Sequence, residues 1–354
     1  MEEQGLTELS EESAELVELG DLDGLTRHVN RLVASSGWRE LAALRLRCRL
    51  ALERGKQLWA VAAHIEYRLA LEAPGRWGAL MLESAPGRFA LGPLPEVAAS
   101  AHAWAELSPH LHATPEAAMA AHERVVRGED LTGDPVAIGL PEVLDLPLRL
   151  EPWEPSYALA EYHADRMGAP PPRLPPLRPL PAVPESPAVP KLPAAPELAP
   201  TRPAGADEVA GALVDLAGTW TTESNGRAEA LGVDGNALDA VAALGARARE
   251  FSELGPGTAI AVMAWAAASG GAYGRRRGAA PGRYAAWWVL ATLGGLSHKW
   301  PLEPDELGEV LQHVRWFAWG AGEPTTGWVL RLAIEVHGGP SNGRAWAISA
   351  TDAA

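Results

Sequence analysis

Residues 327–336 read GWVLRLAIEV, a stretch rich in the β-branched and aromatic residues that favour strands. Every second residue from Trp328 to Val336 is apolar, and the positions between them include Arg331 and Glu335. Because successive side chains of a strand point to opposite faces, this alternation predicts a strand with one face packed against helices and the other facing water.

Two neighbouring stretches have the same character, VRWFAWG at 314–320 and GRAWAISAT at 343–351. Turn-forming residues separate the three, with Glu323-Pro324 in one connection and Gly338–Asn342 in the other. The sequence therefore predicts that the chain ends in a three-stranded antiparallel meander.

Upstream, the apolar spacing changes to three and four residues, which is typical of helices. Helices preceding the meander are expected at 206–219, 235–251, 257–269, 281–294 and 303–314. Further helices are expected at 6–19, 24–35, 37–53, 56–72, 94–107 and 114–127. Residues 131–167 look irregular, with a short helical piece around Tyr157–Arg166. The N-terminal part is thus expected to be a helical bundle or an irregular helical array.

Between these parts, residues 170–203 hold 14 of the 31 prolines. Such a segment is typical of an extended polyproline II tether. Residues 173–179 also match the R-x-x-P-x-x-P pattern of SH3 ligands, although this is expected by chance in so proline-rich a stretch. The fold class is therefore α+β overall, with a helical domain at 1–167, a flexible linker at 168–205 and an α+β domain at 206–354.

Composition narrows the class of protein. Apolar residues make up 47 % and charged residues 21 %, as in globular chains. The net charge of −15 argues against general nucleic-acid binding and against binding to anionic membranes. The acidic N-terminus is unlike a signal peptide, and the longest apolar run, 258–268, is about half a membrane span. The single cysteine, Cys48, excludes an intramolecular disulfide. We expect a cytoplasmic protein.

The most unusual local chemistry is SGGAYGRRRGAAPGR at 269–283, between two apolar helices. A glycine-rich loop before a helix exposes N–H groups near the positive end of the helix dipole, and arginines add planar donors. No Asp or Glu occurs between residues 254 and 302. The pattern predicts a site for an anion or an acidic partner, with candidate residues Ser269, Tyr273, Arg275, Arg276, Arg277 and Arg283.

A structural interpretation of this loop stays open. The glycines can form an interhelical turn, while the arginines cap the preceding helix or pair with the acidic N-terminal domain. Neither a Walker A loop nor a dinucleotide fingerprint is present.

Other candidate sites are weaker. His102, His110, His112 and His122 lie close in sequence, but their spacing favours surface or capping roles, so no metal and no cofactor is expected. The tryptophans of the C-terminal half predict core packing or an aromatic pocket.

Because no catalytic constellation stands out, the sequence favours a non-enzymatic binding or adaptor protein. Its expected partner is another protein or a second copy of the chain, with a small anionic ligand also possible. The alternative is a small-molecule enzyme that holds a phosphate or carboxylate on the same loop, with Tyr273 or His298 carrying the proton.

Overall fold

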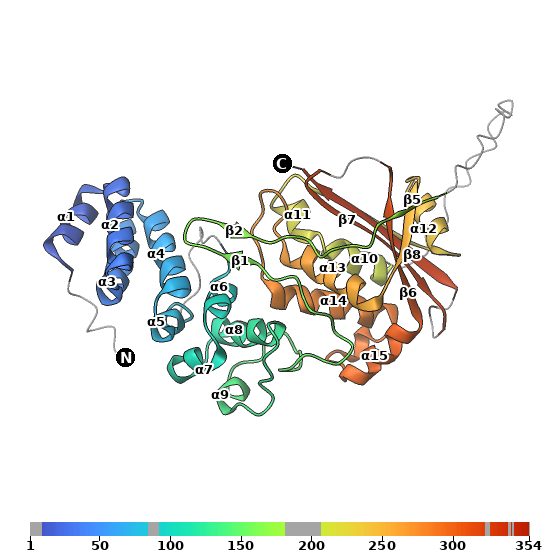
Figure 1. Cartoon of the computed structure of the whole chain (residues 1–354), viewed down its shortest axis with the longest axis horizontal. Helices are drawn as coiled ribbons and strands as arrows, with labels where there is room; N and C mark the ends of the chain where they lie inside the picture. Colours follow the sequence, from blue (N-terminus) through green and yellow to red (C-terminus); the bar gives the residue numbers. More distant parts are fainter. Residues whose placement is uncertain are drawn as a thin grey trace. The chain divides into compact units, whose positions relative to one another are not determined.

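Figure 1 shows the protein as a computed structural model, in which residues 9–83, 92–180, 207–322, 326–338, 341 and 343–353 are described. The chain divides into two compact units. The first is made of Met1–Pro152, Ser156–Pro171 and Arg276–Pro281. The second is made of Trp153–Pro155, Pro172–Arg275 and Gly282–Ala354. The first unit therefore includes the short segment Arg276–Pro281, although the residues on either side of it belong to the second unit. The second unit likewise includes Trp153–Pro155, although the residues on either side of it belong to the first.

These units differ from the domains expected from the sequence at the two short segments and within the proline-rich stretch. Residues 168–171 belong to the first unit and residues 172–180 to the second. Arg178–Pro179 form a short strand, β3, because the Arg178 N–H donates to Ser252 Oγ (2.9 Å) and the Leu180 N–H to the Arg249 carbonyl (2.8 Å). The remainder of the expected linker, 181–205, lies outside the described residues, so its role as a spacer stays a prediction.

The first unit is mainly helical. Its helices are α1 (Glu11–Leu19), α2 (Leu22–Ala34), α3 (Trp38–Ala51), α4 (Trp59–Glu72), α5 (Gly75–Leu80), α6 (Leu94–Ala101), α7 (Trp104–Leu107), α8 (Pro115–Val126) and α9 (Pro135–Ile138). A small hairpin of β1 (Glu161–Tyr162) and β2 (Met167–Gly168) stands where the sequence predicted a helical piece. The Tyr157–Arg166 expectation was wrong because the His163 N–H bonds to the Arg166 carbonyl and closes a turn.

Side-chain caps define where several helices begin. Thr114 Oγ1 accepts the Ala117 N–H at the start of α8, and Pro115 occupies the first position of the helix. Asp21 caps α2, where its side chain accepts the Gly24 N–H. Gly20 ends α1 with a φ of 69°, which is a left-handed conformation that glycine adopts without strain. The expected helix 94–107 is interrupted at His102, where the backbone becomes extended.

Helices α2, α3 and α4 supply half of the buried apolar residues in the main core of the first unit. Leu25, Leu41, Leu44 and Ile65 are fully buried there. Burying one such side chain stabilises the fold by about 1.5–3 kcal/mol.

The second unit combines helices with a sheet. Its helices are α10 (Glu208–Asp215), α11 (Gly218–Thr222), α12 (Ala237–Ala243), α13 (Pro256–Ala268), most of α14 (Ala279–Leu293) and α15 (Pro304–Gln312). Its longer strands are β4 (Arg227–Asp234), β5 (Glu250–Leu254), β6 (Val314–Gly320), β7 (Trp328–Val336) and β8 (Arg344–Asp352).

All neighbouring strands of this sheet are antiparallel, in the order β3-β5-β6-β7-β8-β4. The α+β class and the terminal meander β6-β7-β8 are thereby confirmed. The sheet is nevertheless wider than expected, because β5 and β3 extend it on one side and β4 on the other. The expected helix 235–251 was wrong in its second half. Only Ala237–Ala243, in the first half, is helical, and Glu250 already begins β5.

Helices cover both faces of the sheet (Figure 1). Leu330, Leu332, Ile334 and Val336 of β7 are buried, as the alternation predicted. The expectation that the opposite face meets water holds only in part. On that face Ala333 packs with Phe317, Trp319 and Ala347 beneath Ala240 and Val241 of α12. Arg331 and Glu335 are half-buried beside this covered patch.

None of the helices in the described parts of the chain is long and apolar enough to cross a membrane.

Candidate functional site

The glycine-rich loop after α13 is held in place by side chains of its own unit. Its backbone N–H groups bond to Asp352 Oδ2 from Ala272 (2.6 Å), to Ser224 Oγ from Tyr273 (3.1 Å) and to Glu223 Oε2 from Arg275 (3.0 Å). These are the donors that the sequence suggested for an external anion. Two of the three therefore already bond to carboxylates of the protein, which a ligand phosphate or carboxylate would have to displace.

The close approach of the Asp352 side chain to the backbone of the loop explains the glycine at position 271. Gly271 has a φ of 68°, and a Cβ there would collide with the Asp352 carboxylate. Ser269 is buried, and its Oγ accepts the Gly271 N–H (3.0 Å). Ser269 thus shapes the turn that carries the rest of the loop.

Two candidate side chains of this pinned loop remain accessible. Tyr273 is 62 % exposed, and Arg275 is exposed as well. Both belong to the second unit, whereas the exposed Arg277 belongs to the segment of the first. The structure thus brings Tyr273 and Arg275 together within one unit and assigns Arg277 to the other.

Arg276 is buried within the first unit. Its Nε and Nη2 donate to Glu96 Oε2 (2.7 Å) and Oε1 (2.8 Å), and Tyr162 O–H also donates to Oε2 (2.6 Å). Burial disfavours the Glu96 carboxylate, but the hydrogen bonds and charge of Arg276 outweigh it and hold the pKa of Glu96 below its ordinary value. The bidentate geometry makes this an internal ion pair.

A second buried carboxylate lies in the same cluster. Glu123 accepts the Ala280 N–H (2.8 Å) and a bond from Arg127 Nη1 (2.8 Å). Burial, and then the negative charge of Glu96, raise the pKa of Glu123 to about 7. The segment Arg276–Pro281 therefore docks on two acidic side chains of α6 and α8.

Arg283 forms a similar buried ion pair in the second unit. Its Nε and Nη2 donate to Glu154 Oε2 and Oε1, each at 2.7 Å, and both side chains are fully buried. Trp287 Nε1 also donates to Glu154 Oε2 (3.1 Å), and the Arg283 guanidinium lies 5.2 Å from the Trp287 ring centre. Arg276 and Arg283 each form an ion pair with a glutamate of the N-terminal half of the sequence.

Sequence reasoning missed these carboxylates. Glu96 stands inside the apolar helix LPEVAASA and Glu123 inside PEAAMAAHERVV. A charged residue on an otherwise apolar helix face is seldom buried unless it is paired. That signal indicates that each carboxylate has a partner, but it does not identify the partner.

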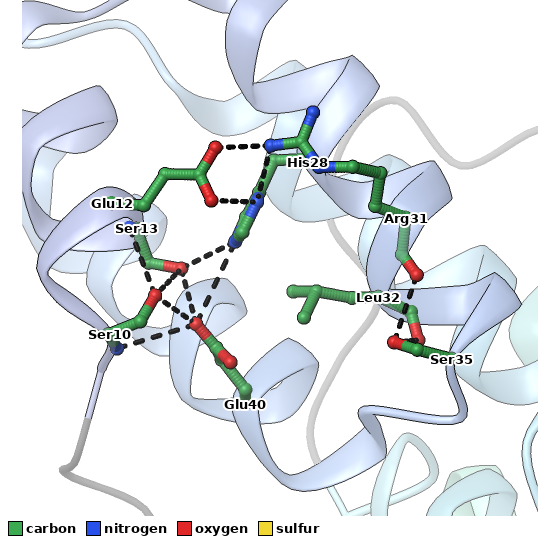
Figure 2. Close-up of polar contacts among 8 residues, drawn as sticks. All are labelled: Ser10, Glu12, Ser13, His28, Arg31, Leu32, Ser35 and Glu40. Carbon is green, nitrogen blue, oxygen red and sulfur yellow. Dashed lines mark hydrogen bonds and ion pairs between the residues drawn. The ribbon is translucent and has the colours of Figure 1, made fainter.

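A polar network that the sequence did not suggest joins α1, α2 and α3 (Figure 2). Ser13 and His28 are buried, with Ser13 Oγ 2.7 Å from His28 Nε2. Ser13 Oγ also donates to Glu40 Oε1 (2.7 Å), and Glu12 lies near His28 Nδ1 (3.5 Å). In composition the cluster resembles a nucleophile, a base and a carboxylate.

The bonds of this cluster tie three helices together. Arg31 Nη2 lies 3.0 Å from His28 Nδ1, and a guanidinium can only donate, so this contact is a hydrogen bond when the ring proton is on Nε2. In that tautomer Nε2 donates to Ser13 Oγ, Ser13 donates to Glu40 Oε1, and His28 has no lone pair free to take a proton from Ser13.

Other reactive candidates are also buried or dispersed. Burial raises the pKa of the Cys48 thiol to about 12, which keeps it protonated. His102 is buried and lies 3.2 Å from the Ala70 carbonyl, whereas His112 faces Glu83 at 3.4 Å. In the described part of the chain, no three His, Cys, Asp or Glu side chains meet as metal ligands do.

Fold and site together define an α+β protein with a pinned, arginine-bearing loop in its sheet-containing unit. The chain belongs to a family of unknown function, DUF6183, whose match covers residues 23–353. No curated protein and no solved structure matches it. The matched range includes the arginine loop, His28 and Glu40, but not Ser13.

Proposed function

We propose that this chain is a non-enzymatic binding protein that docks an acidic protein surface on Tyr273 and Arg275. The observation that supports it is the pinning of the loop by Asp352, Ser224 and Glu223 while these two side chains stay exposed. In this proposal Ser269, Arg276 and Arg283 hold the fold.

Tyrosine and arginine are the residue types that carry much of the binding energy at protein interfaces. A loop that is already fixed loses little conformational entropy when it binds, so more of the contact energy appears as affinity. Arg275 has no carboxylate partner for its guanidinium among the described residues, and its charge is therefore available to an acidic surface.

The test is affinity capture with the purified full-length chain, comparing wild type with Tyr273→Ala and Arg275→Ala. A matched control is Arg247→Ala, which removes another exposed arginine of the second unit. Both loop variants are expected to lower recovery of a specific partner, and added salt is expected to weaken capture because exposed charges are screened. Sedimentation of the chain alone tests whether the partner is a second copy.

Recovery that is equal for all four proteins would contradict the proposal. So would a partner whose binding strengthens in high salt, because the contact would then be mainly apolar.

A further inference from the structure

A cleft of about 400 Å³ opens in the first unit, where α2 turns into α3 and α5 begins. Its lining consists of the turn Ser36–Gly37 together with Trp38, Arg39, Glu40, Arg76 and Trp77. Ser36 has a φ of 56°, an uncommon conformation for a residue with a side chain. The cleft shares no residue with the docking loop.

Two of the lining residues carry unneutralised positive charge. Arg39 and Arg76 are both exposed, and neither forms an ion pair with any carboxylate in the described parts of the chain. The Arg76 guanidinium lies 5.2 Å from the centre of the Trp77 ring, which holds it against an aromatic surface. In a chain of net charge −15, such a pair of free guanidinium groups favours an anion.

The backbone adds to this preference. α3 has 14 residues and begins at Trp38, so its first N–H groups, including those of Arg39 and Glu40, lack acceptors within the helix. The positive end of the helix dipole therefore lies at the same turn as the two arginines.

Glu40 adds a negatively charged carboxylate to the lining of the cleft. Its Oε1 accepts hydrogen bonds from Ser10 and Ser13, which fix the side chain as Figure 2 shows. Its Oε2 has no donor among the described residues, and the side chain is 28 % exposed. Burial disfavours the carboxylate, but the bonds from Ser10 and Ser13 outweigh it and lower the pKa of Glu40. A fixed acceptor thus lines the cleft beside the cations.

From these features we propose that the cleft binds a small organic anion that carries a planar apolar group and an N–H donor. The anionic group would meet Arg39 and Arg76, the planar group would lie against half-buried Trp38, and the N–H would bond to Glu40 Oε2. A phosphate and a carboxylate share the anionic chemistry, and the choice of probes distinguishes them. This inference goes beyond the docking function and does not depend on it.

The experiment is isothermal titration of the full-length chain with four probes. Adenosine monophosphate and N-acetyl-tryptophan both combine a planar N–H-bearing ring with an anion, which is a phosphate in one and a carboxylate in the other. Adenosine lacks the anion, and inorganic phosphate lacks the ring. At least one of the two organic anions is expected to bind about tenfold or more tightly than adenosine and inorganic phosphate.

Variants then locate the site. Arg39→Ala and Arg76→Ala are each expected to weaken the tighter organic anion about tenfold, and Glu40→Gln is expected to weaken it while leaving inorganic phosphate unchanged. Arg47→Ala is the matched control, because Arg47 is exposed on the same helix but does not line the cleft. Thermal unfolding of each variant checks that the fold is retained. Both arginine variants are expected to have the melting temperature of the wild type, because the Arg39 and Arg76 side chains are exposed.

Failure of both organic anions to bind at millimolar concentration would overturn the proposal. Binding that survives both arginine substitutions, or that falls equally in Arg47→Ala, would also overturn it.

Discussion

Arg283 and Glu154 face each other through two parallel hydrogen bonds of 2.7 Å, although 129 residues separate them in sequence. Both side chains are fully buried. A pair of this kind contributes little net stability relative to well-packed apolar residues, but the loss of one partner leaves an uncompensated charge in the core. Glu154 belongs to the three-residue segment Trp153–Pro155 of the second unit, so the pair explains why that segment lies there.

Replacing one member of this pair should be more harmful than replacing both. Arg283→Met is expected to lower the free energy of unfolding by about 3–5 kcal/mol, because Glu154 remains buried without its cation. The double variant Arg283→Met with Glu154→Gln is expected to recover part of this loss. Chemical denaturation of the four proteins of this cycle measures the coupling. Additive effects of the two substitutions would mean that the pair is not formed.

Cutting the chain within residues 181–206 should not release two independent folded halves. The first unit includes Arg276–Pro281 from beyond the cut, and the second includes Trp153–Pro155 from before it. Without Arg276, the buried Glu96 loses its cation. We expect the two fragments to co-elute in native buffer and to separate only in denaturant. Fragments that elute separately, and that each unfold cooperatively, would show that the exchanged segments are dispensable.

Local patterns predicted those elements whose cause is local. The alternation in β7 depends only on consecutive residues, and the structure contains this strand. β4 was missed because RAEALGVD holds a single β-branched residue, Val233, and no aromatic residue, whereas strands are typically rich in both types. Its extended form comes from pairing with β8 along its whole length, which is a long-range interaction.

The same limit applies to the site. The sequence singled out the arginine loop but offered no means to tell Arg275 from Arg276. That distinction depends on Glu96, 180 residues away from Arg276. The Ser13–His28 contact likewise needs the packing of α1 on α2, which no spacing in the sequence reveals.

The two faces of the sheet should respond differently to a charge. Leu332 is 1 % exposed, so Leu332→Asp is expected to cost about 3 kcal/mol or more of stability, because an unpaired carboxylate would be buried. Thr351→Asp on the neighbouring strand is the control, since Thr351 is exposed and its replacement should change stability by about 0.5 kcal/mol or less. Thermal unfolding monitors both. A stable Leu332→Asp protein would contradict the packing of this face.

Glu123 should give the protein a characteristic dependence on pH. Its pKa is raised in the folded state to about 7 from an ordinary value of 4.5, so the folded state binds the proton more tightly than the unfolded chain does. Stability from this group is therefore fully present below pH 4.5 and is lost as the pH rises toward 7.

Glu123→Gln is expected to flatten the slope of unfolding free energy between these two pH values. The slope is the informative quantity, because the substitution also changes the bond to Arg127. Neighbouring Glu96 acts outside this window, since its pKa is lowered and its contribution is lost only at more acidic pH. An unchanged slope in the variant would mean that Glu123 is not protonated on folding.

The central claim is that adjacent arginines of one loop have different roles, with Arg275 contacting a partner and Arg276 holding the fold. Parallel measurement of unfolding free energy and partner affinity in Arg275→Ala and Arg276→Ala tests it most directly. We predict that Arg276→Ala lowers stability by about 3–5 kcal/mol, whereas Arg275→Ala changes stability by about 0.5 kcal/mol or less and weakens binding in a salt-dependent way. Full partner affinity in Arg275→Ala, or wild-type stability in Arg276→Ala, would contradict it.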